Sequence, residues 1–300
     1  MADFKETVSK LLESVDIQIN GSRPHDIQVH NKLFYSRVLS GKSLGLGESY
    51  MDGWWDCEAL DQFSYQMLRG RIDKQVKPSS PAFFVPYIRA YFLNSQSKKR
   101  AYIVGKEHYD TGNDLFSLML DQRMNYSCGY WKIAENLDQA QVHKLDLVCR
   151  KLHLKPGMKV LEIGCGWGGF AKYAAKNYGV SVHGVTVSQE QMEYAEQSCR
   201  GLETVFELKD YRELNTKYDS IVSIGMFEHV GYKNYRSYME VARRCLSDNG
   251  LFLLHTIGRN TSTRATDPWT NKYIFPNGMI PSAEQISKST QGLFILEDWH

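Results

Sequence analysis

The residues of this sequence best suited to chemistry form a glycine-rich turn at 164–169, with the carboxylate of Glu162 just before it. Glycine permits a positive φ and lets backbone N–H groups approach a ligand closely. The turn also satisfies the spacing G-x-G-x-x-G, so a nicotinamide or flavin cofactor has to be weighed. On its glycines alone, the turn predicts a cofactor site and leaves the cofactor open.

Two features favour one cofactor. A dinucleotide site needs an acidic residue about 20 residues further on, at the end of the second strand. Here that strand ends in Gly184-Val185-Thr186-Val187, which contains no acidic residue. A carboxylate at Glu162 would repel a pyrophosphate and suits a ligand with a cationic amino-acid end. The pattern resembles the E/D-x-G-x-G-x-G motif of class I methyltransferases, which implies S-adenosylmethionine (SAM) lying over Gly164 and Gly166.

The elements around this turn alternate between strands and helices from residue 160 onward, which predicts a parallel sheet with crossover helices. A capping box at 188–191 begins a helix that ends at Gly201, a second capping box at 282–285 begins another, and Gly179 ends the helix that follows the glycine turn. The expected strands are 160–163, 180–187, 205–208, 220–224, 251–257 and 293–296, and the expected helices include 168–178 and 235–246. We therefore predict an α/β, Rossmann-like sheet with the turn at its carboxyl edge, where open α/β sheets bind ligands.

The chain before this sheet has a different character. Residues 1–70 are expected to form a smaller N-terminal α+β domain, with a helix at 4–15, a short strand at 17–20 and glycine-rich turns at 43–47. Residues 71–104 are expected to be a linker that carries an aromatic helix (83–93) and a basic cluster (98–100) able to rest on anionic lipid. Residues 105–300 would then form the catalytic domain.

Composition limits the remaining possibilities. With 300 residues, 42% of them hydrophobic, the chain is typical of a soluble globular protein of about two domains. Its net charge of +2 gives no argument for nucleic acid. The six cysteines are scattered without a C-x-x-C pair, which argues against a disulfide framework or a zinc site and favours reduced thiols in the cytoplasm. No apolar run approaches the ~20 residues of a membrane helix.

Six separate segments resemble the cyclopropane-fatty-acid synthases, and the likeness runs from about residue 10 to the end of the chain. They are SLGLGESYMDGWW (43–55), GKEHYD (105–110), YSCGYW (126–131), GMFEHVG (225–231), LHTIG (254–258) and KYIFPNG (272–278). The resemblance implies transfer of a methylene group from SAM to the cis double bond of an unsaturated phospholipid acyl chain. The alkene would attack the sulfonium methyl, and a base would remove a proton from the resulting carbocation as the ring closes. Such a site must be apolar and dry, with a base beside the transferred carbon.

The resemblance also implies roles for individual residues. The base would be a bicarbonate ion held by Cys128, Glu228, His255 and the backbone of Ile257. At the cofactor, Tyr126 and Ser127 would contact the amino-acid end, Thr186 and Gln191 the ribose, and Asp210 and Tyr211 the adenine. His108 and Tyr109 would line the approach to the reaction centre. Gln191 is also the last residue of a capping box, so helix capping is an equal alternative for it. No metal site is indicated.

The resemblance implies a partner as well: a phospholipid membrane, bound peripherally at its cytoplasmic face, and a homodimer is plausible. Family members continue past the equivalent of His300, with a tyrosine that completes the bicarbonate site and a further antiparallel strand. We therefore expect the sheet and site of this chain to lack their C-terminal part. Two alternatives stay open: a methyltransferase that uses SAM without ring closure, and a non-catalytic lipid-binding protein. Neither the headgroup nor the double-bond position can be derived from the sequence.

Overall fold

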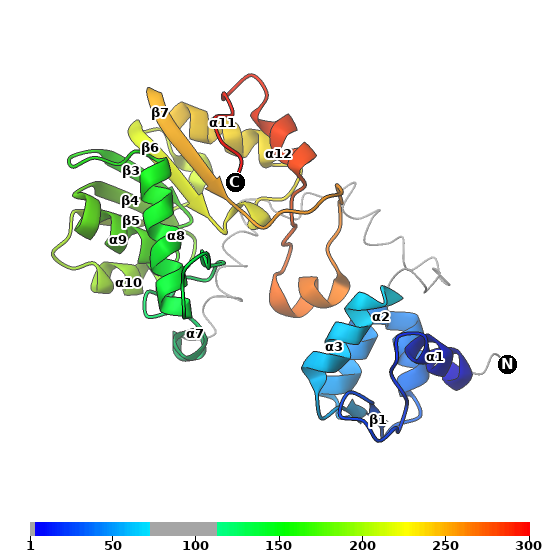
Figure 1. Cartoon of the computed structure of the whole chain (residues 1–300). Coiled ribbons are helices and arrows are strands. Elements are labelled where there is room, and N and C mark those ends of the chain that lie inside the picture. Colours follow the sequence, from blue (N-terminus) through cyan, green and yellow to red (C-terminus); the bar gives the residue numbers. More distant parts are fainter. Residues whose placement is uncertain (1–3, 73–112) are drawn as a thin grey trace. The chain divides into compact units, whose positions relative to one another are not determined.

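The computed structural model of the chain describes residues 4–72 and 113–300, which fall into two compact units (Figure 1). The N-terminal unit comprises Met1–Arg89 together with the distant segment Asp267–Tyr273. The sheet unit comprises Ala90–Thr266 and Ile274–His300. The expected aromatic helix and basic cluster, together with His108 and Tyr109, lie outside the described residues. No helix within 4–72 or 113–300 is both long and apolar enough to cross a membrane.

The sheet unit is built on five parallel strands in the order β5-β4-β3-β6-β7. The strands are β3 (Lys159–Ile163), β4 (Ser181–Thr186), β5 (Thr204–Leu208), β6 (Tyr218–Ile224) and β7 (Leu246–His255). This is the predicted α/β architecture. Because all five strands run the same way, their carboxyl ends meet at one edge of the sheet.

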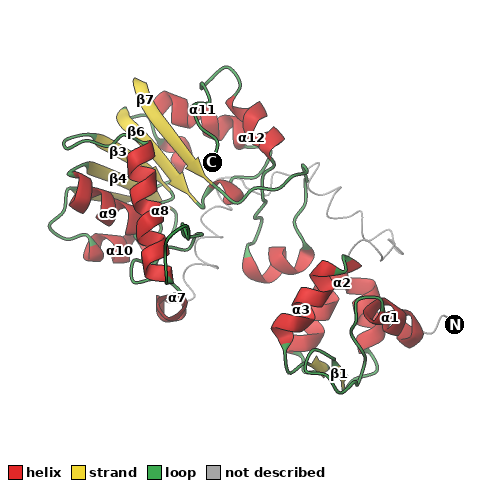
Figure 2. Cartoon of the chain, in the orientation of Figure 1, coloured by secondary structure: helices red, strands yellow, loops and turns green. Residues whose placement is uncertain are grey.

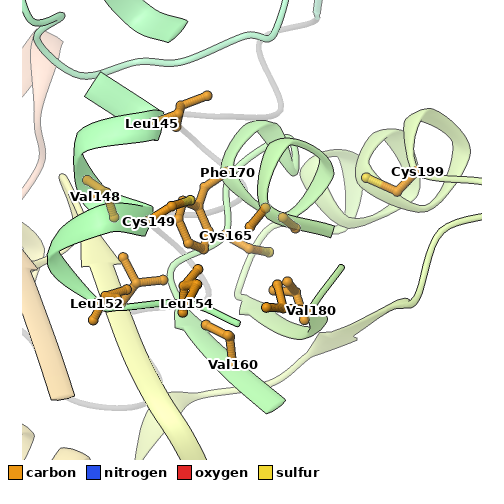
Figure 3. Close-up of a cluster of buried hydrophobic side chains, with 14 of the residues drawn as sticks. Leu145, Val148, Cys149, Leu152, Leu154, Val160, Cys165, Phe170, Val180 and Cys199 are labelled. Carbon is orange, nitrogen blue, oxygen red and sulfur yellow. The ribbon is translucent and has the colours of Figure 1, made fainter. Parts of the chain in front are cut away.

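Helices cover both faces of this sheet (Figure 2). One face carries α8 (Leu137–Lys151), α9 (Gly169–Tyr178) and α10 (Gln189–Ser198), and the other carries α11 (Tyr235–Cys245) and α12 (Ala283–Thr290). Figure 3 shows the first apolar layer, in which Leu145 and Val148 of α8 meet Val160 of β3 and Phe170 of α9. A short helix, α7 (Asn113–Met119), precedes these elements.

The strand expected at 293–296 is not present, and that prediction was wrong. The segment is irregular, and Phe294 packs with its ring centroid 5.6 Å from that of Phe252 on β7. Ile295 is 87% exposed. Within the described residues β7 pairs with β6 alone. The apolar residues at 293–294 therefore pack against the sheet and do not form a strand of it.

The N-terminal unit packs helices around two short strands. Its elements are α1 (Phe4–Glu13), β1 (Gln28–Val29), α2 (Phe34–Met51), β2 (Trp55–Asp56) and α3 (Leu60–Arg69). The strand expected at 17–20 is reduced to a single bridge between Ile19 and Ile27. Ile17, Phe34, Trp55 and Phe63 are among the buried residues of its core.

The prediction of glycine-rich turns at 43–47 was also wrong, because these residues lie inside α2, which is kinked at Lys42. A Cβ on Gly45 would lie 2.2 Å from the carbonyl oxygen of Arg37, and one on Gly47 would lie 2.3 Å from the ring of Trp269. The glycines thus allow close packing rather than chain reversal. Glu48 of the same helix accepts hydrogen bonds from Lys272 and Tyr273, so the distant segment is fastened to α2.

Candidate active site

A pocket in the sheet unit lies at the carboxyl ends of β3, β4 and β5, where an open α/β sheet binds ligands. All nine residues predicted to bind the cofactor line this pocket. They are Tyr126, Ser127, Glu162, Gly164, Gly166, Thr186, Gln191, Asp210 and Tyr211. The residues come from four separate stretches of sequence (126–127, 162–166, 186–191 and 210–211), so it is the fold that brings them together.

The glycine turn forms the floor of the pocket. Gly164 and Gly166 have φ of 83° and 51°, values that favour glycine. A Cβ on Gly164 would lie 2.5 Å from Cγ of Met226, whereas one on Gly166 would meet no atom within 4 Å. Gly164 therefore permits close packing, and Gly166 leaves open space in which a ligand can approach the backbone.

Glu162 is buried beside this turn with 3% of its surface exposed. Its Oε2 has no hydrogen-bond partner among the described residues. Burial raises the pKa of Glu162 well above its usual range, and the positive charge of Lys144 opposes that rise. A buried carboxylate oxygen without a partner is costly unless a ligand supplies one. A cationic amine would meet that need.

Gln191 proves to be only half of a capping box. Its backbone N–H donates to Oγ of Ser188, as a cap requires, but its side-chain Oε1 accepts from the hydroxyl of Thr186 at 3.1 Å. The backbone N–H of Ser188 donates instead to Oγ1 of Thr186. Both Thr186 and Gln191 line the pocket, and the amide side chain bonds to Thr186 there rather than completing the cap.

Asp210 and Tyr211 follow β5 at the far side of the pocket. The carboxylate of Asp210 accepts from the backbone N–H of Arg212 at 2.9 Å and pairs with its guanidinium at 3.1 Å. Tyr211 is buried against Tyr238, with ring centroids 4.9 Å apart. Internal contacts therefore hold both side chains in place at the rim.

Tyr126 and Ser127 belong to a turn that α8 and nearby aromatic rings hold in place. The side-chain amide of Gln141 donates to the carbonyl oxygen of Ser127 at 2.7 Å, and Nζ of Lys144 donates to its hydroxyl at 2.8 Å. The ring of Tyr126 lies between Phe116 and Phe275, with centroid distances of 5.5 and 6.0 Å. One end of the pocket thus has an aromatic wall.

The four residues predicted to hold the base form a second group, here called the reaction cluster: Cys128, Glu228, His255 and Ile257. Sγ of Cys128 lies 3.4 Å from Nε2 of His255, the last residue of β7. Oε1 of Glu228, which follows β6, accepts from the backbone N–H of Ile257 at 2.8 Å. The structure therefore joins these residues as two contacting pairs at the ends of neighbouring strands.

Polar atoms of the reaction cluster are left unsatisfied. Oε2 of Glu228 and Nδ1 of His255 are buried without a hydrogen-bond partner among the described residues. Burial raises the pKa of Glu228. Burial and the positive charge of Lys144 both lower the pKa of His255. A small ion with both donor and acceptor oxygens fits such a set of groups. The described residues contain no group of three or more His, Cys, Asp or Glu arranged to hold a metal.

The sequence did not single out several other residues that line the pocket. Met226 and His229 flank Glu228 in the segment 225–231, and Pro276 and Asn277 lie in the segment 272–278. Both segments resemble the family, so this resemblance could have identified these four residues as candidates. Asn125 and Trp167 also line the pocket and lie beside predicted residues.

Comparison with known proteins gives consistent results. The chain is 56% identical over 295 residues to the cyclopropane-fatty-acyl-phospholipid synthase of Escherichia coli (strain K12), covering 97% of this chain and 76% of that relative. It is 34% identical over 266 residues to the tuberculostearic acid methyltransferase UfaA1 of Mycobacterium tuberculosis (strain H37Rv), covering 81% of this chain and 60% of that protein.

Among solved structures, the chain resembles the mycolic acid cyclopropane synthase CmaA1 complexed with SAH and CTAB. The two are 32% identical with a TM-score of 0.58, and the match covers 63% of this chain and 73% of the other. The family model described as mycolic acid cyclopropane synthetase matches residues 96–300. The chain therefore belongs to the mycolic acid cyclopropane synthetase family of SAM-dependent transferases.

Proposed function

We propose that this chain transfers a methylene group from SAM to the cis double bond of unsaturated phospholipid acyl chains and so forms a cyclopropane ring. The observation that carries this proposal is the reaction cluster, whose buried unsatisfied atoms lie at the ends of β6 and β7 beside the pocket. A simple methyl transfer needs no base at that position. Ring closure does, because a proton must leave the added carbon.

The pocket residues suit SAM on chemical grounds. Glu162 offers a buried carboxylate oxygen to the α-ammonium group, and the open space over Gly166 admits the ligand to the backbone. Thr186 and Gln191 offer hydroxyl and amide groups to the ribose, and Asp210 with Tyr211 lies where the adenine would fit. The structural relative CmaA1, complexed with SAH, supports this assignment. When bound, SAM would supply an electrophilic methyl group at its sulfonium.

The reaction cluster suits bicarbonate as the base. Oε2 of Glu228 and Nδ1 of His255 lack partners, and Cys128 completes a set of groups that can hold an ion with both donor and acceptor oxygens. The backbone N–H of Ile257 donates to Glu228, so its part in this arrangement is to orient that carboxylate. The bound ion would supply a proton acceptor next to the reacting carbon.

The residues around the pocket also have to protect a carbocation. Water that reaches the site would trap the cation as an alcohol, so the surroundings must be apolar. Tyr126 and Met226 line the pocket with aromatic and thioether surfaces, and Phe116 and Phe275 pack against the ring of Tyr126. This apolar wall is consistent with ring closure inside the site.

We further propose that the chain works on phospholipid at the membrane surface, bound peripherally and from the cytoplasmic side. Large apolar side chains are exposed on α7 and in the segment after Ser127: Leu115 (59%), Leu118 (88%), Met119 (48%), Trp131 (53%) and Ile133 (76%). Contiguous patches of exposed apolar side chains commonly mark a site of contact with a membrane or another protein. The ring of Phe116 on α7 contacts Tyr126 at the pocket, so these side chains adjoin the site. A homodimer stays a prediction.

The test is to incubate the protein with SAM and vesicles of an unsaturated phospholipid, and to analyse the released acyl chains by proton NMR. We expect ring-proton signals far upfield, from chains that have gained one CH₂ unit. Vesicles of a saturated phospholipid with the same headgroup are the control and should give no product. A gain of CH₂ without upfield signals would contradict ring closure and favour a methyltransferase. The absence of both product and SAM binding would favour a lipid-binding protein.

A further inference from the structure

Lys144 is a buried ammonium group that the proposed reaction leaves without a role. It lies on α8 with 4% of its surface exposed, and it is not among the residues that line the pocket. Burying a charge is costly unless nearby groups compensate for it. Burial lowers the pKa of Lys144 to about 8. Because burying the Lys144 charge is costly, we expect the contacts of this residue to serve a function.

The hydrogen bond that Lys144 makes is to a neutral group. Its Nζ donates to the hydroxyl oxygen of Ser127 at 2.8 Å. An ammonium group has no acceptor, so the serine oxygen must accept this bond and its own O–H proton must point elsewhere. Ser127 lines the pocket, and Gln141, one turn earlier on α8, fixes its carbonyl oxygen. The helix therefore leaves the serine hydroxyl able to donate to a ligand.

The charge of Lys144 acts on groups of both parts of the site. Asp121, Cys128 and Glu162 surround it as groups that favour its charged form. In return, its charge opposes the rise in the pKa of Glu162 that burial causes. It also helps to keep His255 neutral. One buried cation behind Ser127 and Glu162 thus affects the two groups that face the amino-acid end of the pocket.

We propose that Lys144 is a positioning residue for the amino-acid end of SAM, acting through Ser127 and Glu162 without touching the cofactor. Its ammonium group orients the Ser127 hydroxyl so that it donates to the cofactor carboxylate. Its charge favours the ionised form of Glu162, which would pair with the cofactor ammonium. The proposal rests on the SAM site proposed above and is independent of what the enzyme does with the methyl group.

The experiment compares two ligands on the full chain by calorimetry: SAM, and 5′-methylthioadenosine, which has the adenosine part but no amino-acid end. Lys144→Met should weaken SAM binding about tenfold or more, because the carboxylate of Glu162 loses its compensating charge. Binding of 5′-methylthioadenosine should stay within about twofold of wild type, since adenosine contacts are unchanged. Lys176→Met, at an exposed lysine of α9, is the matched control and should leave both affinities unchanged.

Equal weakening of both ligands would mean that Lys144 only supports the fold, and unchanged SAM binding would mean that it has no role at the site; either result overturns the proposal. Should Lys144→Met fail to fold, Lys144→Gln carries the test, because its amide can still donate to Ser127 but brings no charge. It should weaken SAM binding relative to wild type and again spare 5′-methylthioadenosine.

A pH series adds a readout that a purely structural role would not move. The ratio of wild-type to Lys144→Gln affinity for SAM should shrink as the pH rises through about 8, where Lys144 loses its proton. The amino group of SAM titrates equally in both samples and cancels in the ratio. The titratable groups that face Lys144, namely Asp121, Cys128, Glu162 and His255, are present in both proteins. A ratio that does not change with pH would overturn the electrostatic part of the proposal. Loss of lipid turnover with intact SAM binding would instead count against the proposed function alone.

Discussion

The two halves of the site differ in how far their polar groups are satisfied. Around the cofactor pocket, Thr186 bonds to Gln191, and Asp210 pairs with Arg212. In the reaction cluster, Glu228 and His255 each keep a buried atom without a partner among the described residues. Satisfied groups hold a preformed shape, whereas unsatisfied ones are stabilised only by a ligand. This difference supports a largely preformed cofactor half and our proposal that the reaction cluster binds an ion.

Glu162 and Tyr211 are exceptions in the cofactor half. Oε2 of Glu162 and the hydroxyl of Tyr211 are buried without a hydrogen-bond partner among the described residues, and both residues line the pocket. Internal contacts therefore hold most of the cofactor half, while the amino-acid end of SAM would, in our proposal, satisfy the free oxygen of Glu162.

Glu228→Gln should lower kcat about 100-fold or more and leave SAM binding within about twofold, because a positioned base contributes on this scale and the variant alters only the reaction half. Turnover on phospholipid vesicles and SAM calorimetry measure the two effects. Glu240→Gln, at an exposed position of α11, is the matched control. A parallel loss of SAM affinity would erase the distinction between the halves.

Glu162→Gln should show the reverse pattern. We expect SAM binding to weaken about tenfold to hundredfold, because an amide replaces the charge that pairs with the cofactor ammonium. The free energy of unfolding of the unbound protein should rise, since the variant no longer buries a carboxylate without a partner. Calorimetry and denaturant unfolding measure these effects, with Glu196→Gln on the exposed face of α10 as control. Unchanged SAM affinity would rule out the role given to Glu162.

Removal of bicarbonate should affect the reaction cluster and leave the cofactor half unchanged. In carbonate-depleted buffer we expect turnover to fall about tenfold, because the reaction cluster loses its base, and SAM binding to stay unchanged. Adding bicarbonate back should restore turnover, and chloride at equal ionic strength should not. Full activity after depletion would exclude the ion as the base held by Cys128, Glu228 and His255.

The smallest effect concerns stability and pH. Burial raises the pKa of Glu228, so the folded chain holds this proton more tightly than the unfolded chain. The stabilisation is fully present below the ordinary pKa of a glutamate and is lost as the pH rises through the raised value. The unfolding free energy of wild type should thus fall relative to Glu228→Gln as the pH rises over that window. A difference that is constant with pH would contradict the burial of an ionisable group at this position.

Local signals in the sequence predicted the sheet unit well. The glycine turn needs positive φ at 164 and 166, and the capping box at Ser282 is formed in full, with side-chain bonds in both directions. These features depend on residues close together in the chain. The same kind of signal failed at 43–47, because Gly45 and Gly47 accommodate the Arg37 carbonyl and the Trp269 ring, and Trp269 is distant in sequence.

The sequence predicted which residues line the pocket better than it predicted the contacts they make. Family motifs brought forward the nine pocket residues and the reaction cluster, but no motif indicated that Gln141 and Lys144 hold the turn at Ser127. Nor could the sequence show that Gln191 turns its side chain to Thr186 instead of completing its cap. Both depend on how α8 and α10 pack, which is set by the whole apolar layer rather than by nearby residues.

The central claim is ring closure by loss of a proton from the transferred carbon, and the most direct measurement uses SAM with a fully deuterated methyl group. Incubated with unsaturated phospholipid vesicles, the protein should give acyl chains that keep two deuterium atoms on the added carbon, and the chains should contain a cyclopropane ring and no exocyclic double bond. An added carbon that keeps three deuterium atoms would show that no proton leaves it. That result would contradict the account and identify the protein as a methyltransferase without ring closure.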